Sequence, residues 1–174
     1  MKYTTLILAV FLVIFFTSTT YGIDKRILDS AGVQEMKQVA PDFNLYNLDG
    51  RKVSLKEYHG KVVFLHFWAT WCKPCKEEMP TIEKMYREFN DKKLIVLSVS
   101  IDKGGVDMVR AYTLEFTFPV LLAYSGDIND SYWIWGIPVS YIIDRNGRII
   151  GRAMGPKNWD GDALKTLIKE ILRD

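Results

Sequence analysis

The chain has 174 residues, and 48% of them are apolar, so it can form one folded domain with a true core and a short additional segment. Its 23 lysines and arginines against 21 acidic residues give a formal charge of +2. The sequence contains no basic run, acidic tail or repeat, so we expect no nucleic acid or other polyanion as a partner.

The N-terminus has the composition of an export signal. A positive charge at Lys2 precedes an unbroken apolar run from Leu6 to Phe16, and mostly small or polar residues follow up to Gly22. The run falls short of the roughly 20 apolar residues that span a bilayer as a helix. We therefore predict that residues 1–22 are a signal peptide or an N-terminal membrane anchor. Either would place the rest of the chain in the periplasm or on the outer face of the cytoplasmic membrane.

The segment after this signal is mixed and polar over residues 23–38, and we interpret it as a linker before a domain at 39–174. Two extended runs flank Asp49-Gly50, a dipeptide that favours a hairpin turn. The run at 61–69 is apolar on both faces, which predicts a strand in the middle of a sheet.

Strands and helices then alternate along the chain. A helix is predicted after the cysteines because apolar residues recur there every three or four positions up to Phe89. Further predictions are strands at 94–101, 118–123, 139–143 and 148–151, helices at 106–116 and from Asp160 or Asp162, and an irregular or briefly helical stretch at 129–135. This order predicts an α/β fold with a central mixed sheet flanked by helices.

The two cysteines of the chain, Cys72 and Cys75, lie only three residues apart where a buried strand gives way to a helix. A disulfide that closes so short a loop adds little stability, so the pair indicates chemistry. Unpaired N–H groups and a partial positive charge at a helix start favour a thiolate. We therefore expect Cys72 to attack a substrate disulfide and Cys75 to resolve the mixed disulfide. Lys73 adds a positive charge, and Pro74 suits the first helical turn.

Other uses of the pair remain open. A zinc site would need two more ligands, and the histidines of the sequence are His59 and His66, of which His66 lies in a predicted buried strand. Thiolates also suit Cu(I), so a copper-binding metallochaperone is the alternative function. A thiol peroxidase would need a lone cysteine upstream, which the sequence lacks. We expect no cofactor.

The sequence resembles the thioredoxin superfamily at Phe67-Trp68-Ala69-Thr70-Trp71-Cys72-Lys73-Pro74-Cys75. More narrowly, it resembles the TlpA/ResA-like branch of that superfamily, with an AhpC/TSA-Redoxin-like domain. Separate matches support the resemblance: Ala40-Pro41-Asp42-Phe43, the 106–116 helix, Gly136-Ile137-Pro138-Val139-Ser140 and Asp144-Arg145-Asn146-Gly147. The resemblance implies a thioredoxin fold with an N-terminal β-hairpin and a central helical insertion.

The resemblance also implies roles for individual residues. Pro138 would follow a cis peptide bond and lie against the cysteines, so that the backbone of Ile137 could pair with a substrate strand. Glu78 matches an acidic residue that is thought to tune the protonation of the thiols, although it could equally be a solvated helix residue. Trp71, together with Lys73 and Pro74, would contact the substrate.

His66 departs from thioredoxin, which has an aspartate at this position. It is either a proton shuttle or a satisfied core histidine. Trp133 and Trp135 either line the surface near the cysteines or pack in the core.

The resemblance implies a thiol–disulfide oxidoreductase that reduces disulfides of exported proteins, with apocytochrome c as one candidate substrate. Its electrons would come from a membrane dithiol donor. We expect a monomer.

Overall fold

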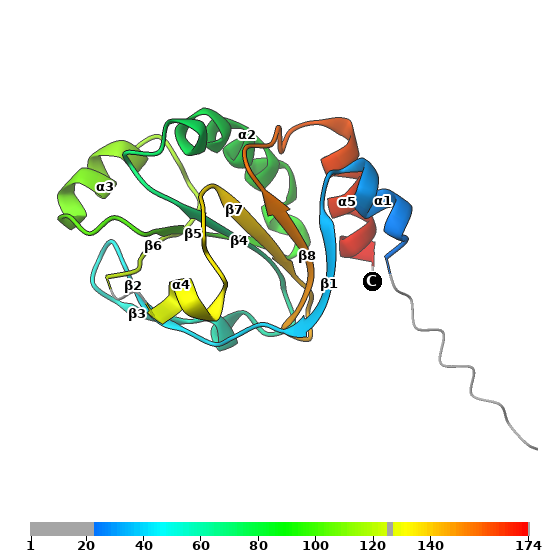
Figure 1. Ribbon diagram of the computed structural model, residues 1–174, viewed down its shortest axis with the longest axis horizontal. Coiled ribbons are helices and arrows are strands. Elements are labelled where there is room, and N and C mark those ends of the chain that lie inside the picture. The colour runs from blue at the N-terminus through cyan, green and yellow to red at the C-terminus, as the bar shows by residue number, and fades with distance from the viewer. Residues whose placement is uncertain (1–22, 125–126, 174) are drawn as a thin grey trace, which may run out of the picture.

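The computed structural model describes residues 23–124 and 127–173 (Figure 1). The predicted signal peptide or anchor at 1–22 lies outside the described residues. Among the helices of the described ranges, none has the length and apolar character needed to cross a membrane.

Eight strands form one mixed sheet in the order β1-β8-β7-β4-β5-β6-β2-β3 (Figure 1). Their bounds are β1 (Gln34–Val39), β2 (Asn44–Asn47), β3 (Lys52–Ser54), β4 (Val62–Trp68), β5 (Leu94–Ser100), β6 (Val120–Leu122), β7 (Val139–Ile143) and β8 (Arg148–Met154). Strand β5 runs parallel to β4 and to β6, while the other pairs are antiparallel. The expected α/β fold with a mixed sheet is therefore confirmed.

Helices cover both faces of the sheet. Their bounds are α1 (Lys25–Ser30), α2 (Lys73–Phe89), α3 (Val106–Thr113), α4 (Asp127–Ser131) and α5 (Asp162–Arg173), with 3₁₀ turns at Leu55–Tyr58 and Asn90–Lys92. The apolar sides of α2 and α5 pack with Phe64 of β4 in one core cluster. On the other face, Ile128 of α4 packs with Leu65. All seven residues of β4 are buried, as expected for a strand between two layers.

The linker expected at 23–38 is wrong, because these residues form α1 and β1. Leu28 and Val33 are almost fully buried in the core, and β1 pairs with β8 at the edge of the sheet. Gly151 of β8 makes room for them, since a Cβ there would lie 2.5 Å from Cγ1 of Val33. Helix α1 has only six residues and β1 is largely polar, so neither produces a clear periodic pattern. The folded domain therefore begins near Lys25 rather than at residue 39.

Other elements follow the expectations with shifted ends. The hairpin around Asp49-Gly50 is present as the antiparallel pair β2 and β3. Strand β8 continues to Met154, three residues beyond its predicted end, because it pairs with both β7 and β1. Helix α3 ends at Thr113, whose hydroxyl donates to the carbonyl oxygen of Val109.

Candidate active site

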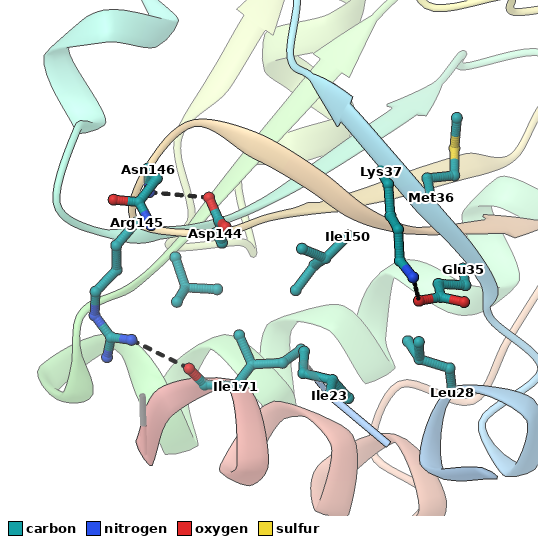
Figure 2. A pocket seen from close by; sticks show the side chains of 11 residues that line it. Ile23, Leu28, Glu35, Met36, Lys37, Asp144, Arg145, Asn146, Ile150 and Ile171 are labelled. Atoms are coloured by element: carbon teal, nitrogen blue, oxygen red, sulfur yellow. Dashed lines mark hydrogen bonds and ion pairs between the residues drawn. The ribbon is translucent and has the colours of Figure 1, made fainter. Parts of the chain in front are cut away.

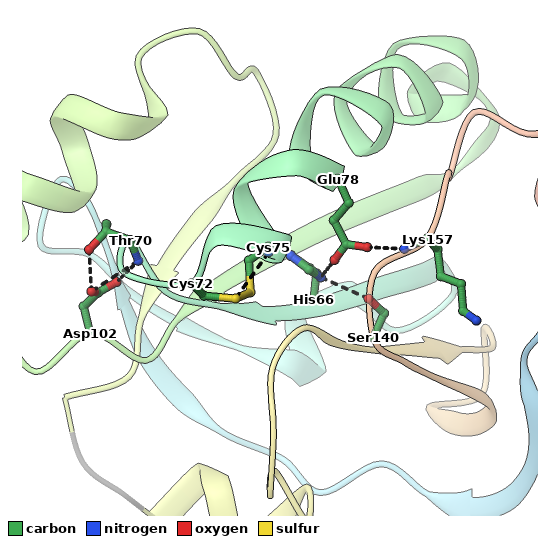
Figure 3. The surroundings of a disulfide bond; sticks show 8 residues. All are labelled: His66, Thr70, Cys72, Cys75, Glu78, Asp102, Ser140 and Lys157. Carbon is green, nitrogen blue, oxygen red and sulfur yellow. Dashed lines mark hydrogen bonds and ion pairs between the residues drawn. A yellow bond between two sulfur atoms is a disulfide. The ribbon is translucent and has the colours of Figure 1, made fainter.

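Cys72 and Cys75 are joined by a disulfide at the start of α2 (Figure 3). Cys72 is the N-cap residue of this helix, and its Sγ accepts a hydrogen bond of 3.2 Å from the backbone N–H of Cys75. Cys72 is 5% exposed, whereas Cys75 is completely buried. The helix start therefore offers its unpaired N–H groups to the sulfur that is also the more accessible of the two.

A buried carboxylate holds the loop in front of the cysteines, and sequence reasoning missed it. Asp102, 4% exposed, accepts hydrogen bonds from the backbone N–H of Thr70 at 2.9 Å and from its hydroxyl at 2.7 Å. It also accepts one from the hydroxyl of Ser100 at 2.7 Å (Figure 3). The signal was the position of Asp102 just after β5, since parallel strands β4 and β5 end at the same edge of the sheet.

The peptide bond between Ile137 and Pro138 is cis, as the resemblance implied. Strand β7 pairs with β4 so that Val139 lies opposite Phe67. Pro138 directly precedes β7, so it lies at the end of β4 where the chain leaves Trp68 and reaches the first cysteine four residues later. The carbonyl oxygen of Pro138 accepts a hydrogen bond of 3.0 Å from the N–H of Gly155. The sheet thus brings this proline to the edge that carries the disulfide.

The residues expected to contact a substrate lie at the surface around this edge. Trp71 is 68% exposed, Lys73 is exposed, and Pro74 and Ile137 are half-buried.

The two tryptophans before the cis-proline are surface residues too. Trp135 is 88% exposed and Trp133 is 41% exposed. The carbonyl oxygen of Trp133 accepts a hydrogen bond of 3.2 Å from the guanidinium of Arg152. Packing of these two side chains in the core is therefore excluded.

Glu78 is buried beneath the surface of α2, so the interpretation as a solvated helix residue is wrong. Its side chain is in the core layer, 3% exposed, whereas the neighbouring Glu77 is exposed. Its Oε2 accepts hydrogen bonds from the N–H of Lys157 at 2.7 Å and from the indole N–H of Trp159 at 3.2 Å. Burial raises the pKa of the Glu78 carboxyl to about 7, against the opposite effect of these two hydrogen bonds.

His66 lies completely buried beside Glu78. Its Nδ1 is 3.0 Å from the hydroxyl oxygen of Ser140 and 3.6 Å from Oε1 of Glu78. Burial lowers the pKa of the His66 imidazole to about 3, so the ring is neutral at ordinary pH. The structure thus brings two titratable side chains together behind the disulfide, one of them in the position where thioredoxin has an aspartate.

Within residues 23–124 and 127–173, no three histidine, cysteine or acidic side chains gather where they could hold a metal ion.

A pocket of about 360 Å³ is lined by Val62, the first residue of β4. The cysteines follow the last residue of this strand, so the pocket lies at the opposite end of β4. Glu35, Lys37 and Arg145 also line this pocket, and the Arg145 guanidinium donates to the carbonyl oxygen of Ile171 (Figure 2). The pocket is therefore separate from the site around the disulfide.

Comparisons with known proteins agree with this arrangement. The model of the AhpC/TSA family matches residues 36–152. The thioredoxin-like protein YneN of Bacillus subtilis is 45% identical over 121 residues, which cover 68% of this chain and 70% of the relative. The thiol-disulfide oxidoreductase ResA of Bacillus thuringiensis is 34% identical over 140 residues, with 79% of each chain covered.

A solved structure agrees as well. The thioredoxin domain of a thiol-disulfide oxidoreductase from Bacteroides vulgatus superposes with a TM-score of 0.68 at 28% identity, and the match covers 77% of this chain and 95% of that one. ResA and the solved Bacteroides vulgatus protein are thus both described as thiol-disulfide oxidoreductases, and the solved domain shares the fold of this chain.

Proposed function

We propose that this protein reduces disulfides in exported proteins. The chain belongs to the AhpC/TSA family and is a TlpA/ResA-like thiol–disulfide oxidoreductase. The observation that carries the proposal is the asymmetry of the pair at the start of α2. Cys72, the N-cap residue, is 5% exposed, whereas Cys75 is completely buried. An attacking thiol must reach its substrate, whereas a resolving thiol needs to reach only its neighbour.

The reaction begins with both cysteines reduced. The Cys72 thiolate, favoured by the helix start, attacks one sulfur of the substrate disulfide and displaces the other as a thiolate. Cys75 then attacks the sulfur of Cys72, which releases the second substrate sulfur and forms the Cys72–Cys75 disulfide. Two electrons have passed to the substrate, and a membrane dithiol donor returns two electrons to the pair.

Residues around the disulfide would hold the substrate. The half-buried Ile137, next to the cis-Pro138, has a backbone that can pair with an extended substrate segment. Trp71 and the Lys73-Pro74 segment border Cys72 on the exposed side. An exposed aromatic ring beside the attacking sulfur offers apolar contact area to an unfolded polypeptide.

The substrates we propose are exported proteins, with the disulfide of apocytochrome c as one candidate. The leader-like composition of residues 1–22 supports export, with cleavage or anchoring of that segment as the two outcomes. The working unit would be a monomer in the periplasm or at the outer face of the cytoplasmic membrane.

The test is covalent trapping. The Cys75→Ser variant, reduced and mixed with an extract of exported proteins, should accumulate adducts that a reductant dissolves, because the mixed disulfide can no longer be resolved. Cys72→Ser is the matched control and should trap none. If Cys75→Ser forms no reducible adduct, the proposed function is wrong. A disulfide-bonded apocytochrome c peptide tests the substrate class, and stoichiometric copper in the reduced wild type would favour the metallochaperone.

A further inference from the structure

Three buried polar atoms under α2 make no hydrogen bond. They are Nε2 of His66, Oε1 of Glu78 and the hydroxyl oxygen of Ser98, in side chains that are 0%, 3% and 0% exposed. A buried polar atom without a partner costs about 1–3 kcal/mol, so such atoms in a native fold call for an explanation. The reaction proposed above gives no role to His66 and none to the free carboxylate oxygen.

The surroundings of His66 form a small polar layer under α2. On the sheet, His66 of β4 lies between Ser140 of β7 and Ser98 of β5, and all three side chains are buried. Glu78 enters the layer from α2, with its Oε1 3.6 Å from Nδ1 of His66. Cys75 precedes Glu78 by three residues on the same helix, so both lie on one helix face about one turn apart.

Figure 3 shows the imidazole of His66 between the disulfide and the carboxyl of Glu78. Nδ1 faces Glu78 and Ser140, with the hydroxyl oxygen of Ser140 at 3.0 Å. The unpartnered Nε2 is on the opposite side of the ring, toward Cys75. A ring with one nitrogen toward the thiol and the other toward a carboxyl can accept a proton on one side and release one on the other.

We propose that His66 passes the proton of the Cys75 thiol to Glu78, so that Cys75 becomes a thiolate without contact with water. This inference rests on the proposed function, in which Cys75 is the resolving thiol.

The step balances as follows. The S–H bond of Cys75 breaks and an N–H bond forms at Nε2, while Nδ1–H of His66 breaks and an O–H bond forms on Glu78. The negative charge moves from the carboxylate to the sulfur. That thiolate attacks Cys72, and the electron pair of the mixed disulfide leaves with the substrate sulfur. When a donor dithiol reduces the pair again, the proton returns from Glu78 by the reverse path.

The electrostatics suit a relay in which the carboxyl holds the proton and the imidazole only transmits it. Burial keeps the pKa of His66 at about 3, so the ring does not store a charge. The pKa of Glu78, about 7, lets that group take up or give back a proton near neutrality. The groups facing the pair from the surrounding elements are Phe64, Cys75, Ser98, Ser140, the indole N–H of Trp159, and Lys157, whose backbone N–H and positive charge both lower the pKa of Glu78.

Nitrogen NMR of the oxidised protein tests the arrangement without reference to activity. Exposed His59 and buried His66 are the two histidines of the chain, so His59 is an internal control. We expect the ring signals of His66 to show a neutral ring and to shift with a midpoint near the pKa of Glu78, about 7. The Glu78→Gln variant should lose that midpoint and leave the ring signals of His59 as they are in the wild type. Signals of His66 that stay constant through neutral pH, or that show the ring itself becoming charged there, would overturn the relay.

Stopped-flow kinetics tests the step itself. Reduced protein reacts with an aromatic disulfide that releases one coloured thiolate when Cys72 attacks and a second when Cys75 resolves. The His66→Asn variant should keep the first rate and slow the second about 100-fold at neutral pH, the usual contribution of a positioned acid–base group. The deficit should shrink at alkaline pH, where hydroxide competes for a thiol proton.

His59→Asn is the matched control and should leave both rates unchanged. An equal deficit at all pH values would indicate a merely structural role for His66 and would contradict the relay. Failure of the wild type to show the first release would instead contradict the proposed function, so the two ideas fail separately.

Discussion

Replacing Glu78 by glutamine should change how the stability of the oxidised protein depends on pH. The carboxyl is 3% exposed, and its pKa is raised by burial from the ordinary 4.5 to about 7. The folded state therefore binds the proton more tightly than the unfolded state. The stability contributed by this group is complete below pH 4.5 and is lost as the pH rises to about 7.

The size of the loss follows from the two pKa values. At about 1.36 kcal/mol for each pH unit between them, protonation of Glu78 is worth about 3 kcal/mol to the folded state. Glutamine is uncharged and has a similar shape, so its carbonyl oxygen can keep the hydrogen bonds from Lys157 and Trp159. The Glu78→Gln variant should match the wild type near pH 4.5 and exceed its stability by about 3 kcal/mol above pH 7.

His66 titrates in the opposite sense and must be considered in the same experiment. Burial lowers its pKa from 6.5 to about 3, so the folded state binds this proton less tightly than the unfolded state. Its contribution is complete above pH 6.5 and is lost as the pH falls toward 3. Between pH 4.5 and 6.5 the two groups oppose each other, and the wild type should show little net dependence from this pair. Glu78→Gln should reveal the rising contribution of His66.

Urea unfolding of the two oxidised proteins across this pH range measures the difference directly. Glu77→Gln is the matched control, because the Glu77 side chain is 63% exposed on the neighbouring position of the same helix. Its stability should stay within about 0.5 kcal/mol of the wild type, as is usual for an exposed substitution. If the difference between Glu78→Gln and the wild type stays constant within about 1 kcal/mol from pH 4.5 to 8, the reasoning about burial is refuted.

Three further changes test the other parts of the structure. Leu28→Ala should destabilise the protein by about 3 kcal/mol in urea unfolding, because it leaves a cavity under α1. The control Val39→Ala, at a 69% exposed position of β1, should cost less than about 0.5 kcal/mol. Equal effects of the two substitutions would support a linker at residues 23–38. Asp102→Asn should cost about 2 kcal/mol, because an amide cannot accept all the hydrogen bonds of the carboxylate, and an unchanged midpoint would contradict its role in holding the loop. Trp135→Ala should leave stability unchanged and raise the KM for a protein disulfide several-fold. The control Leu114→Ala, at a 77% exposed position just after α3, should leave that KM unchanged. Equal KM values for the two variants would show that Trp135 is not part of the substrate surface.

Local patterns in the sequence determined the main elements of the fold. The apolar run of β4 required burial on both faces, and the Asp49-Gly50 turn required a hairpin. The position of Cys72 and Cys75 between a strand and a helix likewise needed no tertiary information, because the physics of a helix start acts within a few residues.

The tertiary structure alone decided which polar residues belong to the site. Burial and contact depend on partners far along the chain: Glu78 meets Trp159, His66 meets Ser140, and Asp102 meets Thr70. Glu77 and Glu78 look alike in the sequence, yet one faces solvent and the other the core. The sequence alone therefore predicts the two thiols and their order of attack. The proton chemistry around them depends on desolvation, which only the packed fold establishes.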